Sequence, residues 1–218
     1  MQLFEYFPIW DQLSSDWQQR LEQAAAYREI PKGTVIHSGE LDCLGLVLVV
    51  RGRLRAYIVS EDGREITIYR LLERDFCLFS ASCMMKNIQF EVTVETETEA
   101  AVWIIPPSVF KGLMEESAAA ANYVNQLMAG RFSEVVWLME QIMWKSFDSR
   151  LAAFLLEESS LEESERLKLT HEKIADHLGT AREVVTRMLR YFQGEGLVRL
   201  SRGTVEILDR EGLEKLAE

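Results

Sequence analysis

The chain has 218 residues, of which 48% are hydrophobic and 27% charged, and these proportions exclude collagen-like, low-complexity and disordered architectures in favour of one or two globular domains. A formal net charge of -11 argues, for the chain as a whole, against a nucleic-acid binder. Three cysteines cannot form a closed disulfide framework, and no apolar run is long enough to span a bilayer, so we expect a cytoplasmic protein without signal peptide or membrane helix.

Short β-rich segments follow one another between residues 30 and 105. They are rich in Val, Ile, Tyr and Thr, are separated by glycine turns, and end at Pro106 and Pro107, which cannot continue a central ladder. Strands at this close spacing predict a small barrel, roll or sandwich and not an α/β sheet. The predicted strands cover residues 34–36, 46–50, 54–59, 66–71, 92–94 and 100–105.

One long helix is predicted from about residue 117 to 145, where there is no proline and a single glycine. Apolar residues recur along it at spacings of four and three, as in a two-stranded coiled coil, and a second stripe of Phe132, Val136, Met139 and Met143 lies beside them. A helix apolar on two sides needs two partners. We expect a second subunit on one side and the strand region on the other, the alternative being a core helix of one monomeric domain. The predicted dimer residues are Val124, Met128, Arg131, Val135, Leu138 and Ile142.

The last third of the chain differs in charge from the rest. A predicted helix over 147–156 and an acidic loop over 157–165 lead into it. Between Lys168 and Glu206 there are seven lysines and arginines against five acidic residues, so the remainder of the chain carries a net charge of -13. A basic module on an acidic carrier fits nucleic-acid contact by the last third only.

The spacing within this module predicts a helix-turn-helix. Thr170 caps a short helix that ends at Gly179, and a second helix follows over 181–193. Residues 197–208 then form a β-hairpin, or wing.

The second helix of this motif carries the side chains expected of a DNA-reading helix. Arg182 and Glu183 open it and Arg187 lies on the same side; an arginine fork suits guanine O6 and N7, and a glutamate accepts from a cytosine amine. The alternative is a set of solvated helix charges in weak ion pairs. The predicted DNA-binding residues are Thr170, Thr180, Arg182, Glu183, Thr186, Arg187, Arg190 and Arg202.

The segment 169–208 resembles the C-terminal domain of the CRP/FNR family of bacterial transcription regulators, whose Arg-Glu-x-x-x-Arg pattern matches Arg182, Glu183 and Arg187. The order of strand roll, long helix and winged helix-turn-helix extends this resemblance over nearly the whole chain. It implies an α+β fold, with a cyclic-nucleotide-binding-like jelly roll (a β-roll) over 1–116, a central dimerisation helix over 117–146 and a winged helix-turn-helix over 147–218. It also implies a homodimer on a two-fold symmetric double-stranded DNA operator, a small-molecule effector in the roll, and contact with RNA polymerase.

The resemblance implies an effector, but the sequence does not match the family's sites for cyclic AMP or an iron–sulfur cluster. The family's cyclic-nucleotide binders neutralise the phosphate with an arginine; the equivalent stretch here has none, and Glu91 would repel a phosphate, so cyclic AMP is not expected. An iron–sulfur cluster needs four cysteines and is not expected either. Cys77 matches the haem-binding segment of the carbon-monoxide sensor, but Phe79 stands where its histidine would be, so the cofactor stays unknown, with haem as one possibility. The predicted effector-binding residues are Phe76, Cys77, Phe79, Phe90 and Trp137.

A thiol switch through Cys77 and Cys83 is a further alternative. The three histidines show no clustering with cysteine, so no metal site is expected apart from haem. Since there is no phosphate-binding glycine loop, paired carboxylates or nucleophile elbow, we do not expect an enzyme. The main hypothesis is therefore an effector-controlled transcription regulator, and the alternatives are a haem-based gas or redox sensor of the same family and a sensor or scaffold whose winged helix binds protein instead of DNA.

Overall fold

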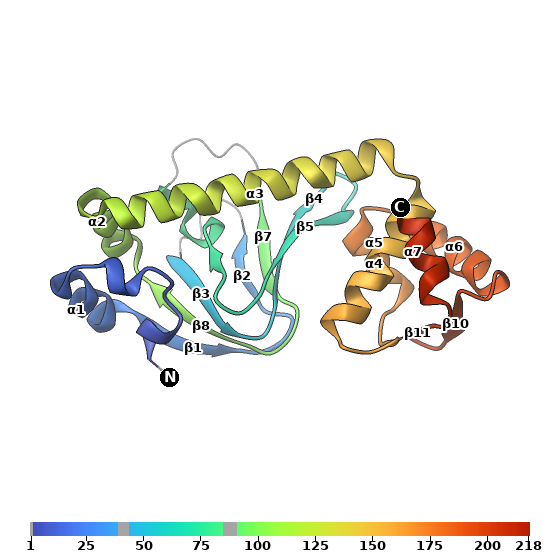
Figure 1. The fold of residues 1–218 in the computed structure, drawn as a ribbon, viewed down its shortest axis with the longest axis horizontal. Helices are drawn as coiled ribbons and strands as arrows, with labels where there is room; N and C mark the ends of the chain where they lie inside the picture. Colours follow the sequence, from blue (N-terminus) through green and yellow to red (C-terminus); the bar gives the residue numbers. More distant parts are fainter. Residues whose placement is uncertain (1, 39–43, 85–90) are drawn as a thin grey trace. The chain divides into compact units, whose positions relative to one another are not determined.

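The computed structural model describes residues 2–38, 44–84 and 91–218, except for the side chains of 82–84, and its helices and strands are labelled in Figure 1. In the described part of the chain, no helix is long and apolar enough to cross a membrane. Contacts divide the protein into two compact units, one of Met1–Ile58 with Ile68–Val135 and one of Val59–Thr67 with Val136–Glu218.

The first unit is built on a roll of two antiparallel sheets, with strand orders β1-β8-β3-β6 and β2-β7-β4-β5. The predicted strands are confirmed, two of them (β4 and β8) with the same bounds, and β1 and β6 are additions that the sequence analysis missed. The strands are β1 (Ala26–Ile30), β2 (Val35–Ser38), β3 (Leu46–Arg51), β4 (Leu54–Val59), β5 (Glu65–Leu71), β6 (Phe76–Cys77), β7 (Thr93–Thr96) and β8 (Ala100–Ile105).

Strand β3 is buried on both sides, because alternate side chains enter two different cores. Val47 and Val49 lie in the core between the two sheets. Leu46 and Leu48 lie on the outer face, against the N-terminal segment and the start of the long helix. This double burial explains why 46–50 is a continuous apolar run and not an alternating one.

Helices that the sequence analysis did not predict cover this outer face: η1 (Leu3–Glu5), η2 (Trp10–Gln12), α1 (Ser15–Ala24) and α2 (Pro107–Glu116). Ser14 caps α1, its side chain accepting from the amide of Trp17, and the indole N–H of Trp17 donates to Glu116 at the end of α2 at 3.2 Å. Pro107 begins α2, where a missing amide hydrogen costs nothing. The same proline pair therefore ends the strand region and starts a helix.

The long helix α3 (Ala118–Trp144) confirms the predicted central helix, and Figure 1 shows it as one continuous element. In its first half, Tyr123, Val124 and Leu127 pack against the outer core of the roll. One turn further on, the guanidinium of Arg131 lies 4.4 Å from the ring centre of Tyr69, on β5. Arg131 therefore packs on the roll of its own chain.

The second unit holds the predicted winged helix-turn-helix. Its elements after α3 are α4 (Phe147–Leu161), β9 (Arg166–Leu167), α5 (His171–Leu178), α6 (Arg182–Gly194), β10 (Val198–Ser201), β11 (Thr204–Ile207) and α7 (Arg210–Ala217). The loop predicted over 157–165 is wrong for its first part, because α4 continues to Leu161. Glu158 lies only 2% exposed on that extension, and α7 packs along α4, so these residues are held as helix by packing.

Two sets of largely buried ion pairs link residues on or beside β4, β5 and β7. The carboxylate of Glu97 follows β7 and lies 2.7 Å from Nε of Arg53 and 2.9 Å from Nε of Arg70. Its side chain is 7% exposed. Arg55, fully buried, pairs with Glu95 at 3.2 Å. Removing one partner of such a pair leaves a charge without compensation in a medium of low dielectric constant.

We expect Glu97→Ala to lower the free energy of unfolding by about 3–5 kcal/mol, because two buried guanidinium groups lose a shared carboxylate. Urea unfolding followed by tryptophan fluorescence measures the change. Glu99→Ala is the matched control: that carboxylate is 71% exposed beside Arg51, and its loss should cost no more than about 1 kcal/mol. Equal costs for the two variants would contradict a stabilising role of the buried network.

Candidate nucleic-acid interface

The turn between α5 and α6 is fixed by local hydrogen bonds and by one glycine. The Thr170 hydroxyl accepts from the amide of Lys173 at 3.1 Å and so caps α5, as predicted. At the other end Gly179 has a φ of 65°, the left-handed conformation that ends a helix at little cost only for glycine, and the amide of Thr180 donates back to the carbonyl of Ala175. These contacts set the angle at which α6 leaves the turn.

Helix α6 has one buried side and one exposed side. Val185, Leu189 and Phe192 are buried in the core of the second unit. On the opposite side a shallow open hollow brings together five of the predicted DNA-binding residues: Arg182, Glu183, Thr186, Arg187 and Arg190. Their shared surface carries three arginines and one glutamate, a composition suited to phosphate and guanine contacts.

The other predicted DNA-binding residues lie at the edges of the motif. The hydroxyl oxygen of Thr170 accepts the hydrogen bond that caps α5, and Thr180 is half-buried in the turn. Arg202 is exposed in the tight turn between β10 and β11, where Gly203 has a φ of 67°. The predicted wing is therefore confirmed as a hairpin, with an arginine at its tip.

One contact at the base of this surface was missed from the sequence. Nδ1 of His171, the first residue of α5, lies 2.8 Å from the hydroxyl oxygen of Thr186 on α6. Partial burial, and then the positive charges of Arg182 and Arg190, lower the pKa of His171 below its ordinary value. The two residues are 15 positions apart, and only the packing of α5 on α6 brings them together.

The predicted dimer residues do not share one environment. Met128 and Ile142 are exposed, and Val135 and Leu138 are half-buried. Val124 packs on the outer core of the roll. Arg131 forms ion pairs with Asp75 at 3.4 Å and with Glu134 at 2.8 Å.

The four predicted effector residues that the structure describes do not share one environment either. Phe76 lies in the outer core and Cys77 in the core between the sheets, as neighbouring strand residues must. The ring of Phe79 stacks on Tyr69 with centroids 6.0 Å apart, and Trp137 is exposed on α3. Phe90 is outside the described residues.

Cys77 is a poor candidate for redox signalling. It is fully buried, and burial raises the pKa of its thiol, which disfavours the reactive thiolate. Cys43 and the side chain of Cys83 are outside the described part of the protein. Among the residues that the structure describes, no three His, Cys, Asp or Glu side chains are grouped as metal ligands would be.

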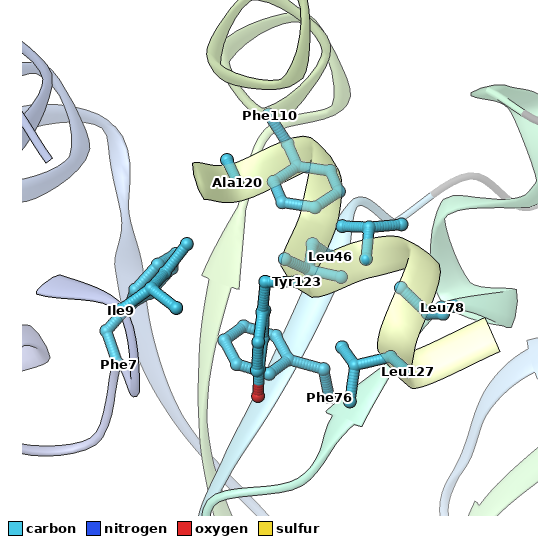
Figure 2. A pocket seen from close by; sticks show the side chains of 10 residues that line it. Phe7, Ile9, Leu46, Phe76, Leu78, Phe110, Ala120, Tyr123 and Leu127 are labelled. Carbon is cyan, nitrogen blue, oxygen red and sulfur yellow. The ribbon is translucent and has the colours of Figure 1, made fainter. Parts of the chain in front are cut away.

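The outer core of the roll contains a cavity of about 10 Å³ beside α3, which Figure 2 shows between Phe7, Phe76 and Tyr123. The ring of Phe76 lies edge-on to those of Phe7 and Tyr123, with centroids 5.3 and 5.8 Å away. A space of this size holds at most one water molecule, and an apolar lining leaves even that water without partners. In this structure the cavity is too small for a small-molecule effector.

A two-sheet roll, a long helix and a winged helix-turn-helix with an arginine-rich exposed side define a DNA-binding regulator with a sensing domain. Two family models match the corresponding segments: "Cyclic nucleotide-binding domain" at residues 27–117 and "Crp-like helix-turn-helix domain" at residues 149–216. The chain belongs to the CRP/FNR family of transcription regulators.

The similar proteins cover most of the chain. The crystal structure of a CRP/FNR-family chain from Eubacterium rectale is 57% identical, with a TM-score of 0.96 over 98% of this chain and 99% of that one. The "Transcriptional activator protein FnrA" of Stutzerimonas stutzeri is 30% identical over 87% of this chain and 80% of its own length. The "Cyclic AMP receptor protein" of Thermus thermophilus is 25% identical over 87% of each chain.

We expect Arg182→Ala to weaken binding to a selected duplex by about 1–3 kcal/mol and to relax the preference at one base pair, because a bidentate guanine contact is lost. The duplex is recovered from a random-sequence pool with the wild-type protein, and affinities are measured by fluorescence anisotropy. Arg20→Ala removes the same charge from α1 of the first unit and should change neither affinity nor preference. Unchanged binding by Arg182→Ala would exclude Arg182 from base reading.

Proposed function

We propose that the protein is a homodimeric, sequence-specific transcription regulator controlled by a small-molecule effector in its roll. The observation that carries this proposal is an exposed apolar stripe on α3. Phe132, Met139 and Met143 are 71%, 54% and 63% exposed. Met128 and Val136 continue the same side of the helix at spacings of four. A row of large apolar side chains left in water usually marks an interface, and this spacing suits a helix of a second copy.

The exposure of these side chains supports a narrower interface than the one predicted from the spacing of apolar residues in the sequence. Arg131 and Val124 are engaged within their own subunit, on the side of α3 that packs on the roll. Of the predicted dimer residues, Met128 lies at the start of the stripe and Ile142 lies beside it, and both are exposed. The proposed subunit contact is therefore centred on Phe132, Met139 and Met143.

A two-fold dimer of this kind presents two copies of α6. Helix-turn-helix dimers place their recognition helices about 34 Å apart, in successive major grooves, so a two-fold symmetric operator is expected. An effector that binds one arrangement of the dimer better than another shifts the population toward it. Contact with RNA polymerase and a cytoplasmic location belong to the same proposal.

The charges at the end of the roll support an effector other than cyclic AMP. Arg131 is the cation that α3 supplies there, and Asp75 and Glu134 already pair with it. A cyclic nucleotide bound beside this cluster would face two carboxylates around one guanidinium, an arrangement that opposes its phosphate. The 25% identity to a cyclic AMP receptor supports a shared fold and is compatible with a different ligand.

We expect Phe132→Glu to convert the dimer into a monomer, because a carboxylate in the centre of an apolar helix interface would be desolvated without a partner. Sedimentation equilibrium measures the mass, and affinity for the selected duplex should fall with it. Ser133→Glu adds the same charge to the neighbouring residue of α3, beside the stripe, and should remain dimeric. A Phe132→Glu variant that stays dimeric would place the interface elsewhere.

We expect isothermal titration with cyclic AMP to give no saturable heat and no change in affinity for the duplex, for the electrostatic reason given above. Saturable binding of one nucleotide per subunit would contradict this prediction.

An anaerobic absorbance titration with haem, followed by carbon monoxide, tests the alternative sensor. A saturable Soret band that shifts with the gas would identify a haem sensor, and its absence would direct the search to small metabolites.

A further inference from the structure

The hydrogen bonds of the Thr186 hydroxyl group favour one tautomer of His171. A threonine hydroxyl has one hydrogen to donate, and Oγ1 of Thr186 donates it to the carbonyl oxygen of Arg182 at 2.9 Å. With its hydrogen on that carbonyl, the same oxygen accepts from Nδ1 of His171, 2.8 Å away. We therefore assign the Nδ1–H tautomer to the neutral ring from this hydrogen-bond arrangement.

The other ring nitrogen, Nε2, is left for an external partner. It makes no hydrogen bond with any residue that the structure describes. In the neutral ring Nε2 is an acceptor and repels the oxygen of a phosphate. When the ring is protonated, Nε2 becomes a donor and carries positive charge, while the bond to Thr186 is unchanged.

The surroundings of His171 favour its neutral form. Partial burial lowers its pKa, and the positive charges of Arg182 and Arg190, on α6, lower it further. On its own helix the next residue is Glu172, whose carboxylate lies 3.8 Å from Nε of Arg182 and is about two-thirds exposed. Lys173 follows on the same helix, and Glu183 lies on the exposed side of α6. The local balance is therefore cationic, and a polyanion that pairs with the arginines removes the repulsion that disfavours the imidazolium ion.

We propose that His171 is a pH-dependent contact to a phosphate of the DNA backbone, made through Nε2 only when the ring is protonated. The proposal rests on DNA binding by α6, because Thr186, to which His171 is bonded, lies on the surface formed with Arg182 and Arg190. Residues beside a recognition helix typically reach phosphates, which position the protein without reading sequence. His171 would therefore add affinity at low pH without changing the preferred sequence.

The sign of the effect follows from proton linkage. The free protein has a lowered pKa at His171, and the phosphate raises the pKa in the complex, so binding takes up a proton between the two values. In that window, around and below the ordinary histidine pKa of about 6.5, affinity rises by up to about tenfold for each unit that the pH falls. The extra charge contact also steepens the dependence of log affinity on log salt concentration by about one.

The test measures anisotropy of the duplex recovered from the random-sequence pool, at several pH values and salt concentrations, with folding checked by circular dichroism. The wild type should show the rise in affinity and the steeper salt dependence at low pH. His171→Gln should lose both, and His171→Arg should bind tightly at every pH. Lys173→Gln removes a permanent charge from the same helix and should keep the pH dependence.

A second measurement observes the ring directly. Nitrogen-15 NMR of the imidazole should report the Nδ1–H tautomer in the free protein and a higher pKa for His171 when the duplex is bound. A wild-type affinity that does not depend on pH, or a His171→Gln variant with the same pH dependence, would overturn the proposal while DNA binding stands. If no duplex is retained at any pH, even at low salt, DNA binding itself fails.

Discussion

A helix of 27 residues that is apolar on two sides is the constraint on which the rest of this protein depends. One side of α3 is satisfied within the chain, where Tyr123 and Leu127 complete the outer core of the roll and Arg131 stacks on Tyr69. The other side, around Phe132, is left in water. Because α3 contributes residues to both compact units, a change in its packing on the roll alters the same element that carries the proposed subunit contact.

Much of the fold was predictable because local signals agreed with the tertiary structure. The strands at 54–59 and 100–105 contain β-branched and aromatic residues. Gly52 precedes the first and the proline pair follows the second, and the structure gives both strands the predicted bounds. Helix α1 and strand β1 were missed because their sequences are mixed in polarity. The apolar side chains of α1 are buried against the outer face of the roll, and this burial cannot be recognised without the tertiary structure. In the same way, nothing local indicates that Glu158 is buried, and so the extension of α4 resembles an acidic loop.

The site was predictable to the extent that it depends on one helix. Helical spacing alone puts Arg182, Glu183 and Arg187 opposite a buried apolar side, and the structure gathers them on one surface. The bond between His171 and Thr186 joins two helices and has no sequence signal. The predicted effector residues Phe76 and Cys77 lie in different cores for a simpler reason: once β6 is a strand, neighbouring side chains must face opposite sides of its sheet.

The uneven distribution of charge has a consequence for how the protein meets DNA. Outside residues 168–206 the chain carries a net charge of -13, whereas the surface of α6 gathers three arginines. The net negative charge of the remainder opposes the approach of a duplex, whereas the arginines of α6 attract it. Long-range attraction of this kind favours the orientation in which α6 faces the duplex, before any base contact forms. The acidic remainder of the chain would then contribute to orientation through its charge alone.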